Sequence, residues 1–122
     1  MRDTAGMYTL EEAREELAKL RPRVDELLAR RADLAELRAD LAAGRESPHG
    51  VLADAKAWEA LLFAELERFA ETGATVKGFA PLLLDYPGEH DGVPVLWCWA
   101  EGDPDIEWYH RVDCGFAGRR PV

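Results

Sequence analysis

Two cysteines, a histidine and an aspartate lie near the end of the chain: Cys98, His110, Asp113 and Cys114. Thiolate, imidazole and carboxylate groups are ligands for transition-metal ions, and such a site needs at least three of them. Cys98, His110 and Asp113, with Cys114 as a further thiol, are therefore candidates for a metal site. The alternative is structural: Cys98 would be a small buried hydrophobic residue, and His110 would be hydrogen-bonded in or near the core. The sequence contains neither a CxxC nor an HxxxH spacing.

The C-terminal residues suggest a second use for the same region. Gly115 and Gly118 would let the tail fold over the preceding strands and bring the Arg119 guanidinium beside Trp99 or Trp108. A guanidinium held in this way would bind a carboxylate or a phosphate through paired hydrogen bonds. The same residues therefore also predict a small-anion site.

The anion site has its own structural alternative. Either Arg119 binds the anion while His110 transfers a proton, or Arg119 pairs with Asp113 or Asp85 and fixes the tail in place. The candidate ligand-binding residues are His110, Arg119, Trp99, Trp108 and Asp85. No set of nucleophile, base and orienting group is evident from the spacing, so the sequence favours a protein that is not an enzyme.

These candidates lie in a region whose composition is typical of strands. Four short runs are rich in β-branched, aromatic or other apolar residues: Thr75–Lys77, Leu82–Tyr86, Val95–Trp99 and Ile106–Val112. Polar turns are expected at Gly88–Gly92 and Glu101–Asp105. The second turn predicts an antiparallel hairpin.

The register of that hairpin decides whether the candidates meet. If Ala100 pairs with Ile106, then Cys98 lies opposite Trp108 and His110 is a diagonal neighbour on the same face. Such neighbours are roughly 7–8 Å apart between Cα atoms, which lets a thiolate and an imidazole approach one metal ion.

Residues 9–43 have the pattern of one long helix. Thr9 and Glu12 form a capping box at its start. Apolar residues recur every seven positions, as in a coiled coil: Ala13, Leu20, Leu27, Leu34 and Leu41. Pro22 removes a backbone hydrogen bond inside this range. Because the repeat continues across Pro22 without a skip, we expect a single bent helix.

A second helix is expected from about Val51 to Thr72, after a turn at Gly44–Gly50. Its apolar arc comprises Val51, Ala55, Trp58, Leu62, Leu66 and Phe69, widened by Leu52 and Phe63. Because the turn is short, the two helices must pair antiparallel.

The composition changes near residue 73, from Ala, Leu, Glu and Arg to Gly, Pro, Trp and β-branched residues. We therefore expect an α+β fold in a single domain of 122 residues. Residues 1–73 would form a long, coiled-coil-like antiparallel helical hairpin. Residues 74–122 would form a small antiparallel β-sheet, covered by the helices, and a C-terminal tail.

Charge and cysteine content exclude several function classes. The formal net charge of −9 argues against nucleic acid or an anionic membrane as a partner. No apolar run is long enough to span a membrane, and the opening Met1–Thr4 has no apolar signal core. Two cysteines are too few for a disulfide scaffold, which predicts a cytoplasmic location. No cofactor is predicted, apart from the transition metal considered above.

Surplus apolar surface predicts self-association. Two helices cannot bury their own seam and also cover a sheet unless part of the seam meets another chain. A second seven-residue series, formed by Leu10, Leu17 and Val24, continues with Arg31 and Arg38. The second half of the first helix would therefore be more hydrated or would pair with acidic residues of a partner. The leading interpretation is a protein-interaction or oligomerisation module, most simply a homodimer.

Several segments resemble one small bacterial family. They are Tyr8–Ala13, Leu84–Pro87, Leu96–Trp99, Trp108–His110 and Gly115–Pro121. Together they are similar to the family called domain of unknown function 2203, and the similarity covers nearly the whole chain. The resemblance implies this fold and a cytoplasmic location. It implies no established activity, so no catalytic residue is transferred from it.

Overall fold

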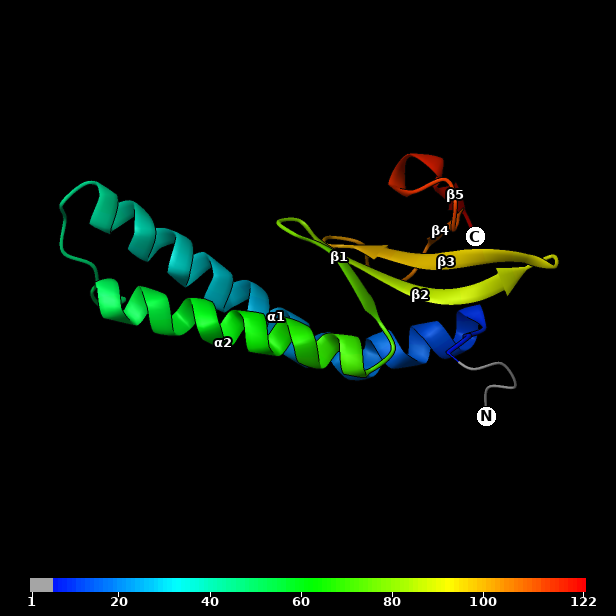
Figure 1. The fold of residues 1–122 in the computed structure, drawn as a ribbon, viewed down its shortest axis with the longest axis horizontal. Coiled ribbons are helices and arrows are strands. Elements are labelled where there is room, and N and C mark those ends of the chain that lie inside the picture. Colours follow the sequence, from blue (N-terminus) through cyan, green and yellow to red (C-terminus); the bar gives the residue numbers. More distant parts are fainter. Residues whose placement is uncertain (1–5) are drawn as a thin grey trace. The chain divides into compact units, whose positions relative to one another are not determined.

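The computed structural model describes residues 6–122, in which two helices precede five strands (Figure 1). The helices are α1 (Leu10–Ala42) and α2 (Leu52–Glu71), and the strands are β1 (Thr75–Phe79), β2 (Leu82–His90), β3 (Val93–Ala100), β4 (Trp108–Arg111) and β5 (Arg120–Pro121), with a 3-10 helix η1 (Phe116–Gly118) before β5. The predicted α+β class is confirmed. The expectation about a signal core concerns Met1–Thr4, which lie outside the described residues.

The chain divides into two compact units. Residues 20–68 form the helical unit, and residues 1–19 together with 69–122 form the sheet unit. Helix α1 therefore begins in the sheet unit and ends in the helical unit. Within residues 6–122, neither helix combines the length and the apolar character needed to cross a bilayer.

The helical unit is an antiparallel pair formed by α1 and α2 (Figure 1). Helix α1 continues through Pro22 as one element, as predicted. The side chains that fill the helical unit's interior come from both helices: Leu20, Val24, Leu27, Leu34, Leu37, Ala55 and Leu62. Because Leu20 and Val24 are buried on either side of Pro22, packing compensates for the hydrogen bond that proline removes.

The predicted apolar seams are wrong at several positions of the helical unit. Leu37, one residue before Arg38, is fully buried, while Arg38 forms an ion pair with Glu59 of α2 in the same chain. Three side chains in or just before α2 that were expected to be buried are exposed: Val51 by 63%, Leu52 by 60% and Phe63 by 62%. Only α1 packs on α2 here, so one flank of the wide apolar arc has no neighbour within this unit.

The sheet unit contains a five-stranded antiparallel sheet in the order β1-β2-β3-β4-β5. Strand β2 is longer than predicted and passes through Pro87 and Gly88, which were expected to end it. The carbonyl of Pro87 accepts a hydrogen bond of 2.7 Å from the Tyr8 backbone. The missing N–H of Pro87 lies on this same edge, beyond the last residue paired with β1, so the ladder with β3 is intact. The turn is consequently shorter than Gly88–Gly92.

One face of the sheet packs on the start of α1. The predicted capping box is confirmed, because the backbone N–H groups of Thr9 and Glu12 donate to each other's side chain. Just before it, Tyr8 packs edge-on against Tyr86 of β2. The Tyr8 carbonyl also accepts a 2.8 Å hydrogen bond from the Trp97 indole of β3. These contacts cover the face that carries the side chains of odd-numbered β3 residues.

The C-terminal tail is more ordered than the sequence suggests. After β4 it forms η1 and then β5, which pairs with β4 through Trp108–Pro121 and Tyr109–Arg120. The sequence analysis did not predict β5, because a strand of two residues ending in proline has no periodicity to recognise.

Candidate functional site

Strand register brings three chemically reactive side chains together on one face of the sheet. Asp85 of β2 is directly opposite Cys98 of β3. Cys98 is opposite Trp108 of β4, as predicted, and His110 is opposite Leu96, so that His110 is the diagonal neighbour of Cys98. Three adjacent strands thus contribute one residue each.

The three side chains form a compact buried cluster. Their ligand atoms, one from each of Asp85, Cys98 and His110, all lie within 4.8 Å of one another. The Asp85 Oδ2 and His110 Nε2 atoms are 3.4 Å apart, and each side chain is at most 5% exposed. We call Asp85, Cys98 and His110 the buried triad.

The hydrogen bonding of His110 fixes the orientation of its ring. Nδ1 lies 2.8 Å from the carbonyl oxygen of Arg111. Because a carbonyl can only accept, Nδ1 carries the proton and donates it. In the neutral imidazole the other nitrogen, Nε2, then holds a lone pair directed at the Asp85 carboxylate.

Cys98 is a neutral thiol in this setting. Burial raises the pKa of Cys98 to about 12, and the charge of Asp85 and a hydrogen bond to it add to the rise. The Arg119 guanidinium lowers the same pKa by a smaller amount. A thiol with so high a pKa is a poor nucleophile at neutral pH.

Arg119 lies over aromatic rings beside the triad. Its guanidinium carbon is 5.0 Å from the centre of the Trp108 ring and 3.9 Å from that of Phe116. The stacking on Trp108 is one of the two arrangements expected from the sequence. The buried Nη1 atom of Arg119 has no hydrogen-bond partner, so it is a donor that an incoming acceptor would satisfy.

Two other predicted residues are not part of this cluster. Trp99 belongs to the opposite face of β3, where its indole donates to the Asp103 carbonyl at 2.8 Å. Asp113 lies past the end of β4, is exposed, and accepts a 2.9 Å hydrogen bond from Arg111 Nε. Arg111 therefore holds the carboxylate expected for Arg119 or for a metal.

Sequence reasoning assigned Asp85 to Arg119 and missed its place beside Cys98. The available signal was its position as the one charged residue in the apolar run Leu82–Tyr86. A second cluster, Asp33, Glu36 and His49, was also missed. It lies in the helical unit, where His49 Nε2 is 2.8 Å from Glu36 Oε1 and the two carboxylates are exposed. Exposed acidic groups of this kind are common on protein surfaces without a bound metal ion, so this second cluster does not indicate a metal site.

Comparison with known proteins places the chain in a family. The family model described as "Uncharacterized conserved protein (DUF2203)" matches residues 6–122. The chain belongs to this family. No curated protein and no solved structure was found to match.

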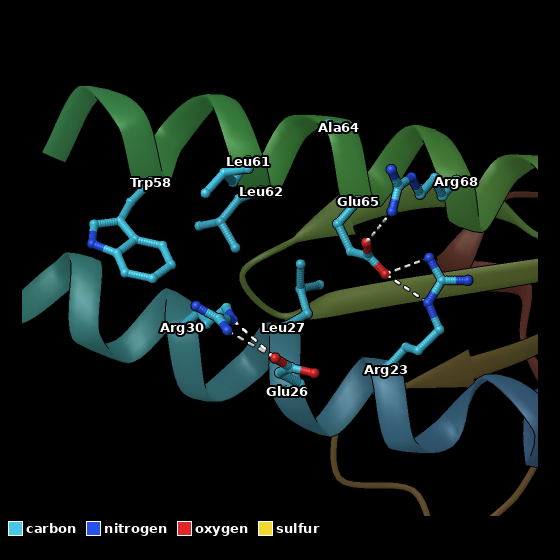
Figure 2. A pocket seen from close by; sticks show the side chains of 10 residues that line it. All are labelled: Arg23, Glu26, Leu27, Arg30, Trp58, Leu61, Leu62, Ala64, Glu65 and Arg68. Carbon is cyan, nitrogen blue, oxygen red and sulfur yellow. Dashed lines mark hydrogen bonds and ion pairs between the residues drawn. The ribbon is translucent and has the colours of Figure 1, made fainter. Parts of the chain in front are cut away.

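The DUF2203 protein also has a groove in its helical unit, between α1 and α2 (Figure 2). The groove has a volume of about 630 Å³ and is lined by Arg23, Glu26, Leu27, Arg30, Trp58, Leu61, Leu62, Ala64, Glu65 and Arg68. Its charged side chains are paired with one another, since Glu65 bonds both Arg23 and Arg68, and Glu26 bonds Arg30. Arg30 also stacks on Trp58. Three arginines and two glutamates leave the lining with a formal charge of +1.

The two free cysteines of this DUF2203 protein are expected to differ sharply in reactivity. Iodoacetamide should label exposed Cys114 in the folded protein and leave Cys98 unmodified, because Cys98 is buried and its pKa is raised to about 12. Mass spectrometry of intact protein would show one added group before denaturation and two after it. Equal labelling rates at the two positions would contradict the burial of Cys98.

Proposed function

We propose that this protein is a self-associating module that forms a homodimer through the outer face of α2. The observation that carries this proposal is the exposure of two large apolar side chains on one side of α2: Leu52 and Phe63 are each about 60% exposed. Contiguous apolar patches on soluble proteins commonly mark interaction sites. Burying such a patch against a second copy would stabilise the dimer by the hydrophobic effect.

Helical periodicity defines the surface involved. Leu52, Lys56, Ala60, Phe63 and Glu67 follow one another at intervals of three or four residues and are all exposed. We call these five residues the outer α2 face. Its centre is apolar and combines a large side chain, Phe63, with a small one, Ala60. Lys56 and Glu67, which are opposite in charge, flank this centre on its two sides.

The charges on α2 indicate which partner fits. Within the helical unit, the acidic and basic side chains of α2 other than Lys56 and Glu67 have partners: Asp54 caps Val51, Glu59 pairs with Arg38, and Glu65 pairs with Arg68. Lys56 and Glu67 form no ion pair with any of residues 6–122. They are about three helical turns apart on one face.

A second copy satisfies both charges at once. In an antiparallel pair of α2 helices centred between Leu61 and Leu62, Lys56 of each chain faces Glu67 of the other. The same centre places Phe63 of each chain on Ala60 of the other. A two-fold interface of this kind is self-complementary, which is the usual arrangement in homodimers. The reciprocal charges also select the antiparallel orientation.

Charge reversal tests this interface. Lys56→Glu replaces two attractive pairs in the dimer by two repulsive ones, and at about 1 kcal/mol per pair the Kd should rise about 30-fold. Glu67→Lys should act in the same way, and the double variant Lys56→Glu with Glu67→Lys should restore the wild-type Kd. Sedimentation equilibrium at micromolar concentrations measures each value.

The matched control for Glu67→Lys is Glu46→Lys, which makes the same charge change in the exposed turn between the helices. It should leave the Kd unchanged. A wild-type protein that stays monomeric at all concentrations would contradict self-association and favour a different protein as the partner. A dimer that is indifferent to every charge reversal would contradict the outer α2 face as its interface.

We also propose that the protein works in the reducing cytoplasm. Support comes from Cys98 and Cys114, which are both free thiols in the structure. Free thiols persist where glutathione and thioredoxin keep them reduced. Fractionation of cells that express the tagged full chain would test the location.

A further inference from the structure

The buried triad has the composition and the geometry of a metal site. We propose that Asp85, Cys98 and His110 bind one divalent transition-metal ion of the zinc class. The donor set offers one oxygen, one nitrogen and one sulfur, a combination that zinc accepts in four-coordinate sites. This site differs from the sequence prediction in one ligand, because Asp85 takes the position expected for Asp113.

Distances within the triad fit a tetrahedral ion. Oxygen and nitrogen ligands about 2.1 Å from a tetrahedral zinc ion are about 3.4 Å from each other. Asp85 Oδ2 and His110 Nε2 are 3.4 Å apart. The sulfur of Cys98 is within 4.8 Å of a carboxylate oxygen of Asp85 and of a ring nitrogen of His110, so a small side-chain movement would complete a three-ligand set.

The hydrogen bond made by Nδ1 of His110 leaves Nε2 as the ring nitrogen that can bind a metal ion. The Nδ1–H group of His110 donates to the Arg111 carbonyl at 2.8 Å, and metal-binding histidines commonly hold their other nitrogen in this way. Nε2 of His110 and a carboxylate oxygen of Asp85 face each other in a buried environment. A metal ion bound there would accept a lone pair from each, and the Cys98 sulfur lies beside them.

Only three protein ligands are present, which leaves one position for water or another small ligand. Arg119 Nη1 is buried without a hydrogen-bond partner, so an acceptor bound beside it would satisfy this donor. When the ion binds, the Cys98 thiol releases its proton to solvent.

Cobalt spectroscopy on the full chain tests the site. After treatment with a chelator, the wild-type protein should bind one equivalent of Co²⁺ and develop the charge-transfer absorption of a cobalt–thiolate bond. Cys98→Ser should abolish this band, and Asp85→Asn should weaken Co²⁺ binding by roughly 100-fold or more. Cys114→Ser and Asp113→Asn are matched controls, because neither residue belongs to the triad, and both should behave as the wild type.

Circular dichroism of each variant without metal separates loss of the site from loss of the fold. Asp85→Asn nearly preserves the shape of the side chain and therefore serves as the second variant if Cys98→Ser fails to fold. A folded wild-type protein that develops no cobalt–thiolate band with excess Co²⁺ would overturn the proposal. Loss of the band in Cys114→Ser but not in Cys98→Ser would overturn it as well, because the exposed thiol would then be the ligand.

Discussion

Replacing Gly88 by alanine is expected to destabilise the sheet unit by about 3 kcal/mol. A Cβ atom at this position would overlap the indole nitrogen of Trp97 and the backbone carbonyl oxygen of Tyr8. Neither can move freely, because the Trp97 indole donates to that carbonyl at 2.8 Å and the Tyr8 backbone is bonded to Pro87. The extra methyl group therefore separates the start of α1 from the sheet. Urea denaturation followed by tryptophan fluorescence measures the loss.

Gly92→Ala is the matched control for this prediction. Gly92 lies in the turn between β2 and β3 with a φ of 79°, but a Cβ there would meet no atom within 4 Å. Only backbone strain of about 1 kcal/mol is expected from this substitution. If alanine at Gly88 costs no more than alanine at Gly92, the close packing of Tyr8 and Trp97 on β2 is wrong.

The hairpin of β3 and β4 could be predicted from sequence because its register is local. The polar turn at Glu101–Asp105 fixes which residues face each other, and alternation then places Cys98 and His110 on one face. The structure has this register, with Cys98 opposite Trp108. Two of the three members of the buried triad, Cys98 and His110, are thus placed by a short segment of the chain.

The third member of the triad depends on pairing that the sequence left ambiguous. Reading Pro87 as the end of a strand and Gly88–Gly92 as a turn gave no register between β2 and β3. In the structure β2 continues to His90, and the tight turn that follows aligns Asp85 with Cys98. The proline is tolerated because its missing N–H faces an edge that β1 has already left. Whether Pro87 is tolerated therefore depends on where β1 stops pairing with β2. The sequence of the β2–β3 hairpin alone does not specify that point.

The contrast between Asp85 and Asp113 shows what sequence spacing omits. Asp113 is closer than Asp85 to His110 along the chain. However, Arg111 is also close to Asp113 and forms an ion pair with Asp113 on the surface. Asp85 is distant in sequence, but it is only 3% exposed on β2. Asp85 faces His110 and the Cys98 thiol because strand pairing places it in a buried site beside them, although it is far from both in the sequence.

The helices illustrate a limit of periodicity. Their existence and antiparallel pairing follow from the apolar repeat and the short turn, and both are confirmed. Periodicity could not decide how much of the wide arc on α2 is covered, because α1 supplies only one neighbouring surface in the helical unit. Leu52 and Phe63 were expected inside and are exposed. Surface that packing leaves open in this way is what the proposed dimer would bury.

Zinc is expected to raise the melting temperature of the sheet unit by roughly 15 °C or more at a free concentration of 1,000 times the Kd. Ligand binding to the native state alone adds about 4 kcal/mol under this condition, and a unit of this size gains at least about 4 °C per kcal/mol. The stabilisation should be concentrated here because Asp85, Cys98 and His110 join three adjacent strands. Differential scanning calorimetry with zinc, and again with excess chelator, measures the shift.

The variant that isolates this effect is His110→Ala, which removes one ligand and should show the same melting temperature with zinc and with chelator. Asp113→Asn should keep the full shift, because Asp113 bonds Arg111 on the surface. An unspecific effect of zinc on exposed carboxylates would instead stabilise or destabilise all three proteins alike. Since the chain has many more acidic than basic residues, that comparison is needed to assign the shift to the triad. A wild-type melting temperature that does not respond to zinc would contradict a metal ion shared by the three strands.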